Sequence, residues 1–483
     1  MTVRLLWLML VFTLFLPRIV ICSMQQRVQD LLQSRNYLPG NGIGVVIRDL
    51  ESDSIVVSIN ADSMMNPASV SKLVTGTSAL ELLGPTFTYS TKVFIEGAFN
   101  ADSGVVEGNL CIKGQGDPGF STERLWLFVQ HLKHRGLKKI TGDLILDDYY
   151  FDTVSMGPGF SEDDGSRTYQ SLVNALCVNF SSVAIHQRTG RSIGAPVHID
   201  VFPRIEGIRI NSSAVTVAPG TRDNLDVTTS FDRGTTQINV RGGMPLNGPS
   251  RYTYRKVWQT WETFGGAVQA QFADNGMRLS GKILHRKISD SLISKGEFYS
   301  FESEPLTEFI DHMFKWSSNF TAEMLFKTMA AQKSGQGTWQ GGAEVVQKWW
   351  ESRNLPGKPV IVNGSGMGAN TNRCSSRQIA DLLAYVYKQK SYFPDFLSSL
   401  SVAGIDGTLK VRFYRSRLRG VVRAKTGTLN SAGVSSLAGY VLLPQKTYSF
   451  AIICNKVGQG QYDNWVIQEQ ILEQLVSAIR WKE

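Results

Sequence analysis

The chain has 483 residues, with a hydrophobic content of 42% and a charged content of 19%, which are the proportions of a globular protein rather than a disordered one. This length exceeds what one hydrophobic core usually holds, so two or three domains are expected. The formal net charge of +9 comes without a dense block of lysine and arginine, so we expect no nucleic-acid partner, and only weak attraction to anionic walls or to a membrane surface.

The first residues have the layout of a secretory signal. Arg4 gives a short basic start, an apolar run follows over 5–16, and small residues stand near Cys22. The run is short for a membrane span, and Ile21 in front of Cys22 disfavours a lipoprotein signal. We therefore expect residues 1–23 to be a signal peptide, either cleaved or retained as an anchor, and the protein to be periplasmic or otherwise extracytoplasmic.

Hydrophobic periodicity then predicts a chain of mixed α and β structure. Alternation over 42–60 predicts a hairpin, and after Pro67 an apolar repeat of helical spacing runs to the stop signal Gly84-Pro85. Short strand-like pieces rich in Gly, Asp and Thr fill 91–293 and predict one or two β-rich modules. Two helices, three strands and a closing helix are predicted at 304–316, 321–332, 420–429, 434–443, 448–457 and 464–481. We expect an α/β (α+β) fold, in which helices cover an antiparallel sheet and the middle modules are insertions.

Ser69 and Lys72 stand at the start of the helix that follows Pro67. Residues three apart share a helix face, so the Lys72 amine can reach the Ser69 hydroxyl. The positive end of the helix dipole and partial burial favour the neutral amine that a base must be. On spacing alone, an N-capping serine beside a solvated lysine is the simpler explanation. The pair becomes a candidate nucleophile and base only if further partners exist.

Two other segments supply such partners. Ser317-Ser318-Asn319 lies between two predicted helices, and Lys425-Thr426-Gly427-Thr428 lies on a predicted strand. Alone, the first segment is an ordinary polar turn. In this order after Ser69 and Lys72, the segments complete the SxxK, SxN and KTG set of penicillin-recognising enzymes.

With these motifs the chain resembles the class C low-molecular-mass penicillin-binding proteins, the D-alanyl-D-alanine carboxypeptidase/endopeptidase family. The resemblance extends to the segments "NPASVSKL", "GNLCIKGQGDP", "ITGDLILDD", "VAGIDGTL" and "AKTGTLNSAG", which spread over most of the chain. Two segments depart from the pattern of the family: "GPGFSEDDG", where a Pro-Gly-Trp segment is common, and "NGSGMGANTN", where Asp-Gly-Ser-Gly is common. These departures concern the details of substrate binding more than the reaction.

The resemblance implies a penicillin-binding/β-lactamase-like transpeptidase fold and a role for each motif. Ser69 would be the acylated nucleophile, Lys72 its base, and Ser317 a relay of the proton to the leaving amine. Substrate binding would fall to Asn319 and to the segment 425–428. Within that segment Lys425 and Thr428 would hold the terminal carboxylate, and the backbone amides of Ser69 and Thr428 would donate to the developing oxyanion. Asp164 would meet a basic group of the peptide stem, although a solvated loop acid explains it equally well.

The resemblance also implies a catalytic domain interrupted by insertions. We expect this domain over 24–92 and 294–483, a first module over 93–172 and 273–293, and a second module over 173–272. Peptidoglycan stem peptides would be the substrates and β-lactams the covalent inhibitors, with no metal or organic cofactor. The oligomeric state and the balance of carboxypeptidase to endopeptidase activity stay open.

Two alternative functions use the same fold. A β-lactamase would differ mainly in deacylation, and the chain has no obvious equivalent of the glutamate that activates water in the class A enzymes. A non-hydrolytic wall-binding or penicillin-sensing protein would have lost turnover, which the intact three motifs argue against.

The remaining polar motifs favour structural roles. "GQGDPG" at 114–119 matches a dinucleotide-binding pattern, but Pro118 removes a backbone donor and the helix cap Ser121 comes too late, so a tight turn is expected. His131 and His134 have no neighbouring acid suited to zinc.

Glycosylation and disulfide bonding are the last features to weigh. Asn319-Phe320-Thr321 is a glycosylation sequon that would obstruct the cleft, which favours a bacterial cell. Buried free thiols are expected at Cys111 and Cys454, with one disulfide open among four cysteines, Cys111, Cys177, Cys374 and Cys454.

Overall fold

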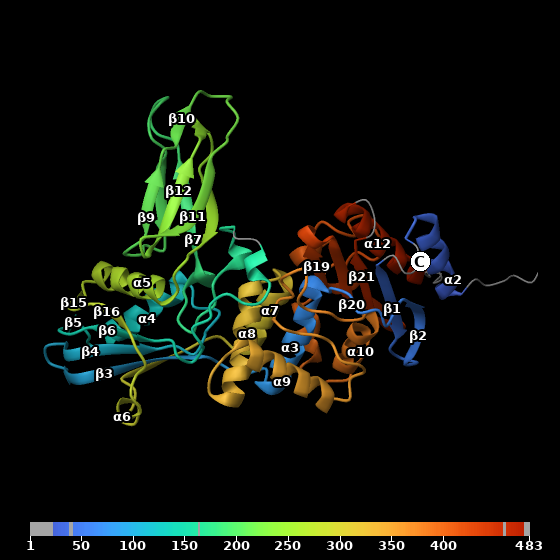
Figure 1. Ribbon diagram of the computed structural model, residues 1–483, viewed down its shortest axis with the longest axis horizontal. Coiled ribbons are helices and arrows are strands. Elements are labelled where there is room, and N and C mark those ends of the chain that lie inside the picture. Colours follow the sequence, from blue (N-terminus) through green and yellow to red (C-terminus); the bar gives the residue numbers. More distant parts are fainter. Residues whose placement is uncertain (1–22, 38–41, 163–164, 457–459, 478–483) are drawn as a thin grey trace, which may run out of the picture.

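The computed structural model describes residues 23–37, 42–162, 165–456 and 460–477 (Figure 1). The predicted signal peptide lies outside these residues except for Ser23, whose side chain caps helix α2 (Met24–Ser34). The described chain forms a large domain and two smaller modules, which are inserted between helices α3 (Ser71–Leu82) and α7 (Leu306–Lys315). Among the helices described, none combines the length and the apolar character that a membrane crossing needs.

The large domain is built on one six-stranded antiparallel sheet with the order β18-β19-β20-β21-β1-β2. Strand β1 pairs with β21, so the predicted N-terminal hairpin and the predicted C-terminal strands form a single sheet. Its strands are β1 (Ile43–Asp49), β2 (Ser54–Ile59), β18 (Ser401–Val402), β19 (Val422–Leu429), β20 (Val434–Leu443) and β21 (Lys446–Asn455). These strands confirm the hairpin and the three later strands that the sequence predicts.

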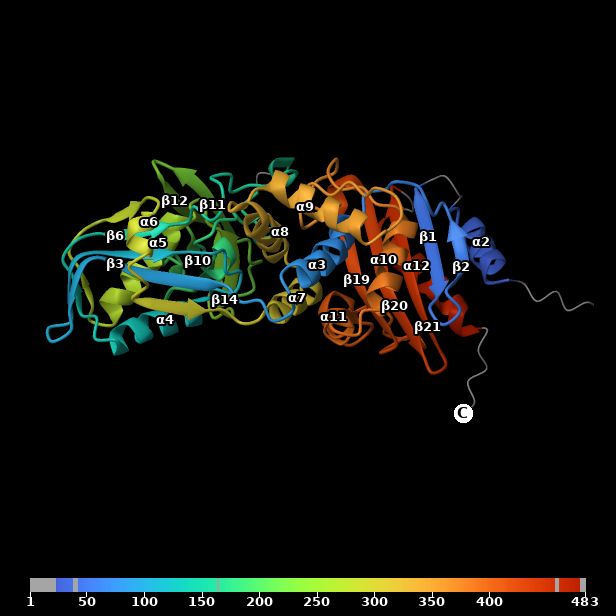
Figure 2. The same ribbon diagram turned by 90° about the horizontal axis from the view of Figure 1, so that it is seen from below.

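Helices cover both faces of this sheet. Because side chains alternate along a strand, Val45 and Ile47 of β1 enter the core beneath α2 and α12 (Gln461–Ser477), whereas Val46 enters the core on the opposite face. On that opposite face α10 (Ser376–Tyr387) packs directly against the sheet. The core there continues through α3, α7, α8 (Asn319–Ser334), α9 (Trp339–Ser352) and α11 (Phe393–Ser399). Figure 2 shows α3, α7 and α8 between the sheet and the first module.

Helix α3 is the central element of the large domain, because every residue from 71 to 80 is buried. A helix that is buried all round needs close neighbours on every side. Gly76 provides one such approach, since a Cβ at this position would lie 2.5 Å from the ring of Phe314. The helix that carries Lys72 is therefore held rigidly.

The first module is a mixed sheet with two long helices. Its elements are β3 (Ser90–Asn100), β4 (Val105–Lys113), α4 (Thr122–His134), β5 (Lys139–Ile140), β6 (Leu144–Asp147), α5 (Trp261–Asp274), β15 (Arg278–Leu279), β16 (Ile283–His285), α6 (Asp290–Ile293) and β17 (Tyr299–Glu302). Phe128 of α4 and Phe264 of α5 share one core with the sheet. Strand β17 pairs with β3, which brings the chain back to the large domain at α7.

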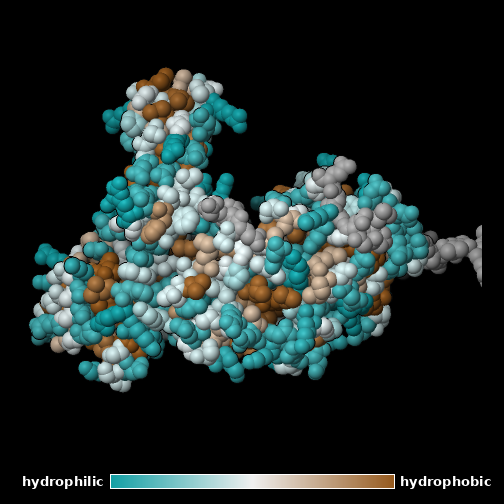
Figure 3. Space-filling view, viewed as in Figure 1, coloured by the Kyte–Doolittle hydropathy of each residue, from teal (hydrophilic) through white to brown (hydrophobic). Residues whose placement is uncertain are grey.

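The second module consists of small β-sheets and projects from the body of the molecule (Figures 1 and 3). Its strands are β7 (Ser182–Arg188), β8 (His198–Phe202), β9 (Arg209–Ser212), β10 (Val215–Val217), β11 (Asp226–Asp232), β12 (Thr235–Arg241), β13 (Gly243–Pro245) and β14 (Arg251–Lys256). Val183, Ile238 and Val240 contribute to its own small core. Figure 3 shows hydrophobic residues at the tip of this module.

The division into one catalytic domain and two modules stays a prediction, and some elements lie across its predicted boundaries. Strand β17 joins the first-module sheet although it falls beyond the predicted boundary at residue 293. Helix α5 packs in the first-module core although 261–272 falls in the predicted second module. The sequence does not indicate these placements, because strand pairing and helix docking join segments far apart along the chain.

Candidate active site

Ser69 lies in a short 3-10 turn, η1 (Ala68–Val70), immediately before α3. Asn66 shapes this turn: its side chain accepts a hydrogen bond from the Ala68 amide at 2.8 Å and donates to the Gly368 carbonyl at 3.0 Å. Ala68 has a φ of 45°, a conformation that non-glycine residues rarely adopt. Ala68 and Val70 are buried, whereas Ser69 is half-buried. The N-cap of α3 is Val70 and no side-chain cap bond is made, so Ser69 is not a capping serine.

The Lys72 amine lies in the centre of a hydrogen-bonded cluster. Its Nζ is 2.8 Å from Ser69 Oγ, 2.7 Å from Asn319 Oδ1 and 2.8 Å from the Ser365 carbonyl oxygen. Burial lowers the pKa of Lys72 to about 7, although the negative charge of Glu323 raises it in part. A neutral amine is therefore well populated near pH 7, and its lone pair can take the Ser69 proton. A solvated lysine, the simpler explanation from spacing, is wrong for this residue.

Ser317 and Lys425 form a second serine–lysine pair beside the first. Lys425 Nζ donates to Ser317 Oγ at 2.8 Å and to the Thr426 carbonyl oxygen at 2.8 Å. Ser317 has a φ of 58°, and this left-handed backbone stands where α7 ends and α8 begins. Burial holds the pKa of Lys425 well below its usual value, and the nearby Lys72 amine lowers it further. Simultaneous protonation of the Lys72 and Lys425 amines is thus disfavoured.

Strand β19 closes the site along one side. Gly427 is required there, since a Cβ at this position would lie 2.5 Å from the Pro67 carbonyl oxygen and 3.2 Å from the Ser69 amide nitrogen. The Thr426 hydroxyl donates to Thr408 Oγ1 at 2.8 Å. The exposed Thr428 accepts from Gln461 Nε2 at 3.1 Å.

These segments surround a cavity of about 520 Å³, which we call the catalytic cleft. Ser69 and Ser317 reach it from the helical side and Thr428 from the sheet. The cleft is lined by Ser69, Gly159, Tyr169, Ser317, Asn319, Gly366, Met367, Gly368, Thr428, Leu429, Asn430 and Ser431. The structure thus brings together Ser69, Lys72, Ser317, Asn319 and the segment 425–428. Asp164 lies outside the described residues.

Two groups to which the sequence analysis gave no role, the Glu323 carboxylate and the Ser365 carbonyl oxygen, position the Lys72 amine. Glu323 on α8 is completely buried, and its carboxylate accepts from the amides of Gly364 and Ser365 at 3.0 and 2.9 Å and from the Trp339 indole at 2.7 Å. This carboxylate fixes the loop whose Ser365 carbonyl oxygen accepts a hydrogen bond from Lys72. The sequence carries only a weak signal for this role of Glu323: it is an acid within the largely apolar run of a predicted helix, four residues after Asn319.

Replacing Glu323 with Gln tests this positioning role. Gln offers one acceptor oxygen instead of two, so an amide of the 364–365 loop loses its partner, and we expect kcat/KM to fall about 10- to 100-fold. Loss of the negative charge also lowers the pKa of Lys72, so the acid limb of the pH profile of kcat/KM should move to lower pH. An unchanged acid limb with an unchanged rate would contradict the role, and Glu344→Gln on the exposed face of α9 serves as the control.

The other sequence motifs have structural roles in the described chain. The side chain of Ser121 caps α4 and accepts from the Arg124 amide, and the Asp117 carboxylate accepts from the Gly119 amide, so "GQGDPG" is a tight turn as predicted. All four cysteines after residue 23 are buried free thiols. Within the residues that the structure describes, no three His, Cys, Asp or Glu side chains are grouped to hold a metal ion.

The chain is similar to known proteins over most of its length. The chain matches the D-Ala-D-Ala carboxypeptidase 3 (S13) family over residues 24–475. It is 28% identical to a D-alanyl-D-alanine carboxypeptidase of Actinomadura sp. (strain R39) over 439 residues, which cover 88% of this chain and 80% of the relative. It is 25% identical to the penicillin-sensitive carboxypeptidase A of Dictyostelium discoideum over 471 residues, covering 92% and 86% of the two chains.

Among solved structures, the chain is similar to penicillin-binding protein 4 (dacB) from Haemophilus influenzae. The TM-score is 0.78 at 23% sequence identity, and the match covers 93% of this chain and 98% of the other. This likeness confirms the predicted penicillin-binding fold with its inserted, β-rich segments.

Proposed function

The chain belongs to the D-Ala-D-Ala carboxypeptidase 3 (S13) family, and we propose that it releases the terminal D-alanine of peptidoglycan stem peptides through an acyl-enzyme on Ser69. One observation carries the assignment of the nucleophile. The buried Lys72 amine, with a pKa of about 7, lies 2.8 Å from a serine hydroxyl that opens into a cleft. A serine becomes a nucleophile only when a neighbouring base takes its proton.

Acylation begins when Lys72 takes the Ser69 proton and Ser69 Oγ attacks the carbonyl carbon of the penultimate D-alanine. The negative charge that develops on the carbonyl oxygen is met by the backbone amides of Ser69 and Thr428. Each such donor contributes about 3 kcal/mol in other acyl-transfer enzymes. The close approach of Gly427 to the Ser69 amide supports this arrangement, because it holds β19 against η1.

The leaving D-alanine needs a proton on its amine and a partner for its carboxylate. Ser317 lies 2.8 Å from the Lys425 amine, so the serine hydroxyl can pass a proton to the leaving amine. The substrate carboxylate brings a negative charge that raises the pKa of Lys425, whose pKa burial otherwise lowers. Carboxylate binding thus favours protonation at Lys425, while the positive charge there favours the neutral form of Lys72.

Water then hydrolyses the ester and frees Ser69. A β-lactam carries a reactive amide and a carboxylate, so we propose that it acylates the same serine and blocks the cleft. A structure of the Haemophilus influenzae protein complexed with a β-lactam supports this extension. Cleavage of cross-bridges between stems is a further proposed activity of the same cleft, and Asp164 stays a proposed contact for a basic group of the stem.

The substrate lies outside the cytoplasm, and we therefore propose that residues 1–23 direct export to the periplasm or another extracytoplasmic space. Mass spectrometry of the protein recovered from outside the membrane would identify its first residue. Recovery of the protein only from the cytoplasm would contradict this location.

Turnover on a defined substrate tests the proposed function. The protein is incubated with a stem pentapeptide, and the released D-alanine and the tetrapeptide are identified by mass. A parallel incubation with labelled penicillin, followed by peptide mapping, locates the adduct. We expect D-alanine release and an adduct on Ser69, and the lifetime of the adduct separates a peptidase from a β-lactamase. A folded protein that gives neither product would overturn the proposal.

The rate should depend on pH through Lys72. Because the base must be deprotonated, kcat/KM is expected to rise with pH through a pKa of about 7 and to fall about tenfold for each pH unit below it. Initial rates of D-alanine release in a constant-ionic-strength buffer series measure this limb. A rate that stays constant from about pH 5 to pH 8 would show that Lys72 is not the base.

A further inference from the structure

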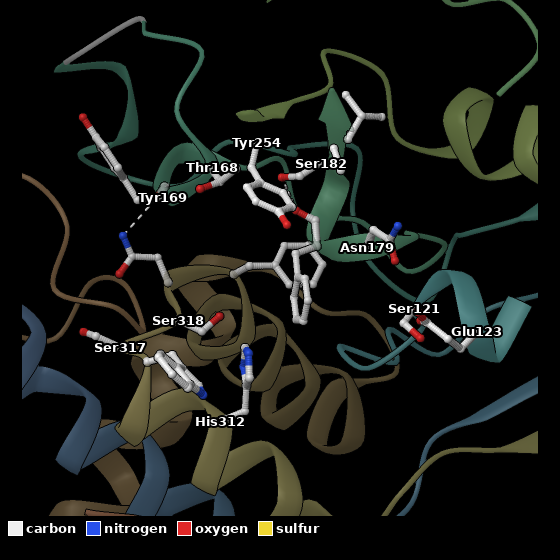
Figure 4. A pocket seen from close by; sticks show the side chains of 16 residues that line it. Ser121, Glu123, Thr168, Tyr169, Asn179, Ser182, Tyr254, His312, Ser317 and Ser318 are labelled. Carbon is white, nitrogen blue, oxygen red and sulfur yellow. Dashed lines mark hydrogen bonds between the residues drawn. The ribbon is translucent and has the colours of Figure 1, made fainter. Parts of the chain in front are cut away.

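A second pocket adjoins the catalytic cleft on the side of the inserted modules (Figure 4). We call it the aromatic pocket. Its volume is about 590 Å³, within the range of small-molecule sites. Tyr169, Ser317 and Asn319 line both cavities, so a ligand in the aromatic pocket lies next to a substrate in the cleft. The pocket is lined by Ser121, Glu123, Thr168, Tyr169, Asn179, Phe180, Ser182, Val183, Ala184, Tyr254, His312, Trp316, Ser317, Ser318, Asn319 and Phe320.

Aromatic rings from distant segments meet in this pocket and stay accessible. The side chains of Tyr254 on β14 and Trp316 at the end of α7 are 59% and 70% exposed, and Phe180 is 36% exposed. Figure 4 shows Tyr254 and His312 reaching into the pocket from opposite sides. Large apolar side chains that stay accessible around one hollow mark a binding surface.

The backbone around Phe180 is strained, and the ring of Phe180 is stacked on a neighbouring side chain. Asn179, Phe180 and Ser181 are consecutive non-glycine residues with φ values of 49°, 58° and 49°. The Phe180 ring stacks on His312 with centroids 5.0 Å apart and an angle of 8°. Such strain persists only where the surroundings enforce it, and it concentrates at functional sites.

The charge of the pocket decides which part of a peptidoglycan substrate it fits. Glu123 alone among its lining residues carries a formal charge at neutral pH, because burial lowers the pKa of His312. A stem peptide carries carboxylates as well as a basic group, and its carboxylates are disfavoured in a negative, apolar pocket. The sugar that carries the stem is different: its pyranose ring has apolar C–H faces for aromatic rings, with neutral hydroxyl and acetamido groups at its edges. Asn179, Ser182 and Ser318 on the lining are neutral and polar. Each already makes a hydrogen bond inside the protein, and each keeps further hydrogen-bonding capacity for those edges.

We propose that the aromatic pocket binds a sugar ring of the glycan strand that carries the stem peptide, so that the protein distinguishes wall-attached stems from free peptides. This inference rests on the proposed function for its substrate, and it adds a subsite for the uncharged part of that substrate. Tyr254 comes from the second module, which gives that insertion a role in substrate choice.

Two substrates that differ only in the sugar test the proposal. We expect wild-type kcat/KM to be about tenfold higher for a disaccharide-linked pentapeptide than for the free pentapeptide, which corresponds to about 1.4 kcal/mol. In Tyr254→Ala this ratio should fall to about one. Tyr252→Ala is the matched control, because Tyr252 lies two residues away on β14, is 54% exposed and does not line the pocket. The control variant should keep the wild-type ratio.

Binding of the sugar alone gives a second readout that needs no turnover. Saturation-transfer NMR with the peptide-free disaccharide should detect contact with the wild type and with Tyr252→Ala, and much weaker contact with Tyr254→Ala. Three results would each overturn the proposal. They are a wild-type ratio of the two kcat/KM values near one, no contact of the wild type with the disaccharide, and an equal fall in kcat/KM for both substrates in Tyr254→Ala. A preference for a sugar-free, cross-linked peptide dimer would also overturn it, because it would assign the pocket to a second stem. If penicillin forms no adduct on Ser69, the proposed function is wrong, and the NMR measurement still decides whether the aromatic pocket binds the sugar.

Discussion

Ser69→Ala should abolish covalent labelling by penicillin and reduce D-alanine release by a factor on the order of 10⁵–10⁶. The substitution removes the oxygen that we propose to form the acyl-enzyme. In the described chain the Ser69 hydroxyl is the one hydroxyl that both lines the cleft and is hydrogen-bonded to the Lys72 amine. The residual rate would come from the oxyanion donors and from substrate binding, which the variant keeps. Initial rates on a stem pentapeptide, with labelled penicillin and mass spectrometry in parallel, measure both effects.

Because Ser69 is half-buried at the edge of η1, the change removes a small polar group and should leave the fold intact. Ser431→Ala is a matched control, since Ser431 lines the same cleft but makes no contact with Lys72 among the described hydrogen bonds. We expect the control variant to take up penicillin. An adduct on another residue of Ser69→Ala, or a loss of less than about tenfold, would remove Ser69 from the mechanism.

The elements with strong periodicity were predictable from the sequence. The hairpin 42–60, the helix after Pro67 and the strand of Lys425 follow from alternation, helical spacing and stop signals, and the structure confirms them. The placement of α5 and β17 was not predictable. Their partners, the first-module core and β3, lie far away along the chain, and local pattern carries no information on which surface a helix or strand will cover.

The site was predictable where its chemistry depends on residue type at fixed spacing. Ser69 and Lys72 are three residues apart, and Ser317 and Asn319 are two apart, so each pair leaves a local signature. The contacts that position the Lys72 amine and set its pKa leave no such signature in the sequence. The Ser365 carbonyl oxygen is a backbone atom that any residue could supply, and Glu323 acts through the fold of the 364–365 loop. The burial that lowers the pKa of Lys72 arises only when α3, α8 and β19 come together.

Lys72→Met keeps the length and volume of the side chain and removes the amine, and we expect kcat/KM to fall by on the order of 10³–10⁴. Penicillin should still label Ser69, but at a rate slower by a similar factor, which distinguishes loss of the base from loss of the nucleophile. The double variant with Ser69→Ala should be no slower than Ser69→Ala alone, because the two groups act as one unit. Rapid labelling of Lys72→Met would show that another group takes the Ser69 proton.

Lys72→Met also tests, through protein stability, whether burial is the cause of the low pKa of Lys72. The pKa of Lys72 is about 7 in the folded protein against a usual 10.5, so between these pH values the unfolded chain binds a proton that the folded chain does not. Wild-type stability therefore loses a contribution as the pH falls from 10.5 toward 7, and Lys72→Met lacks this loss. Thermal unfolding of both proteins is measured across that pH range. The stability of the wild type minus that of Lys72→Met should become smaller as the pH falls, or change sign in favour of the variant. If the two curves stay parallel, the lysine is not buried as a neutral amine, and the base must be sought elsewhere.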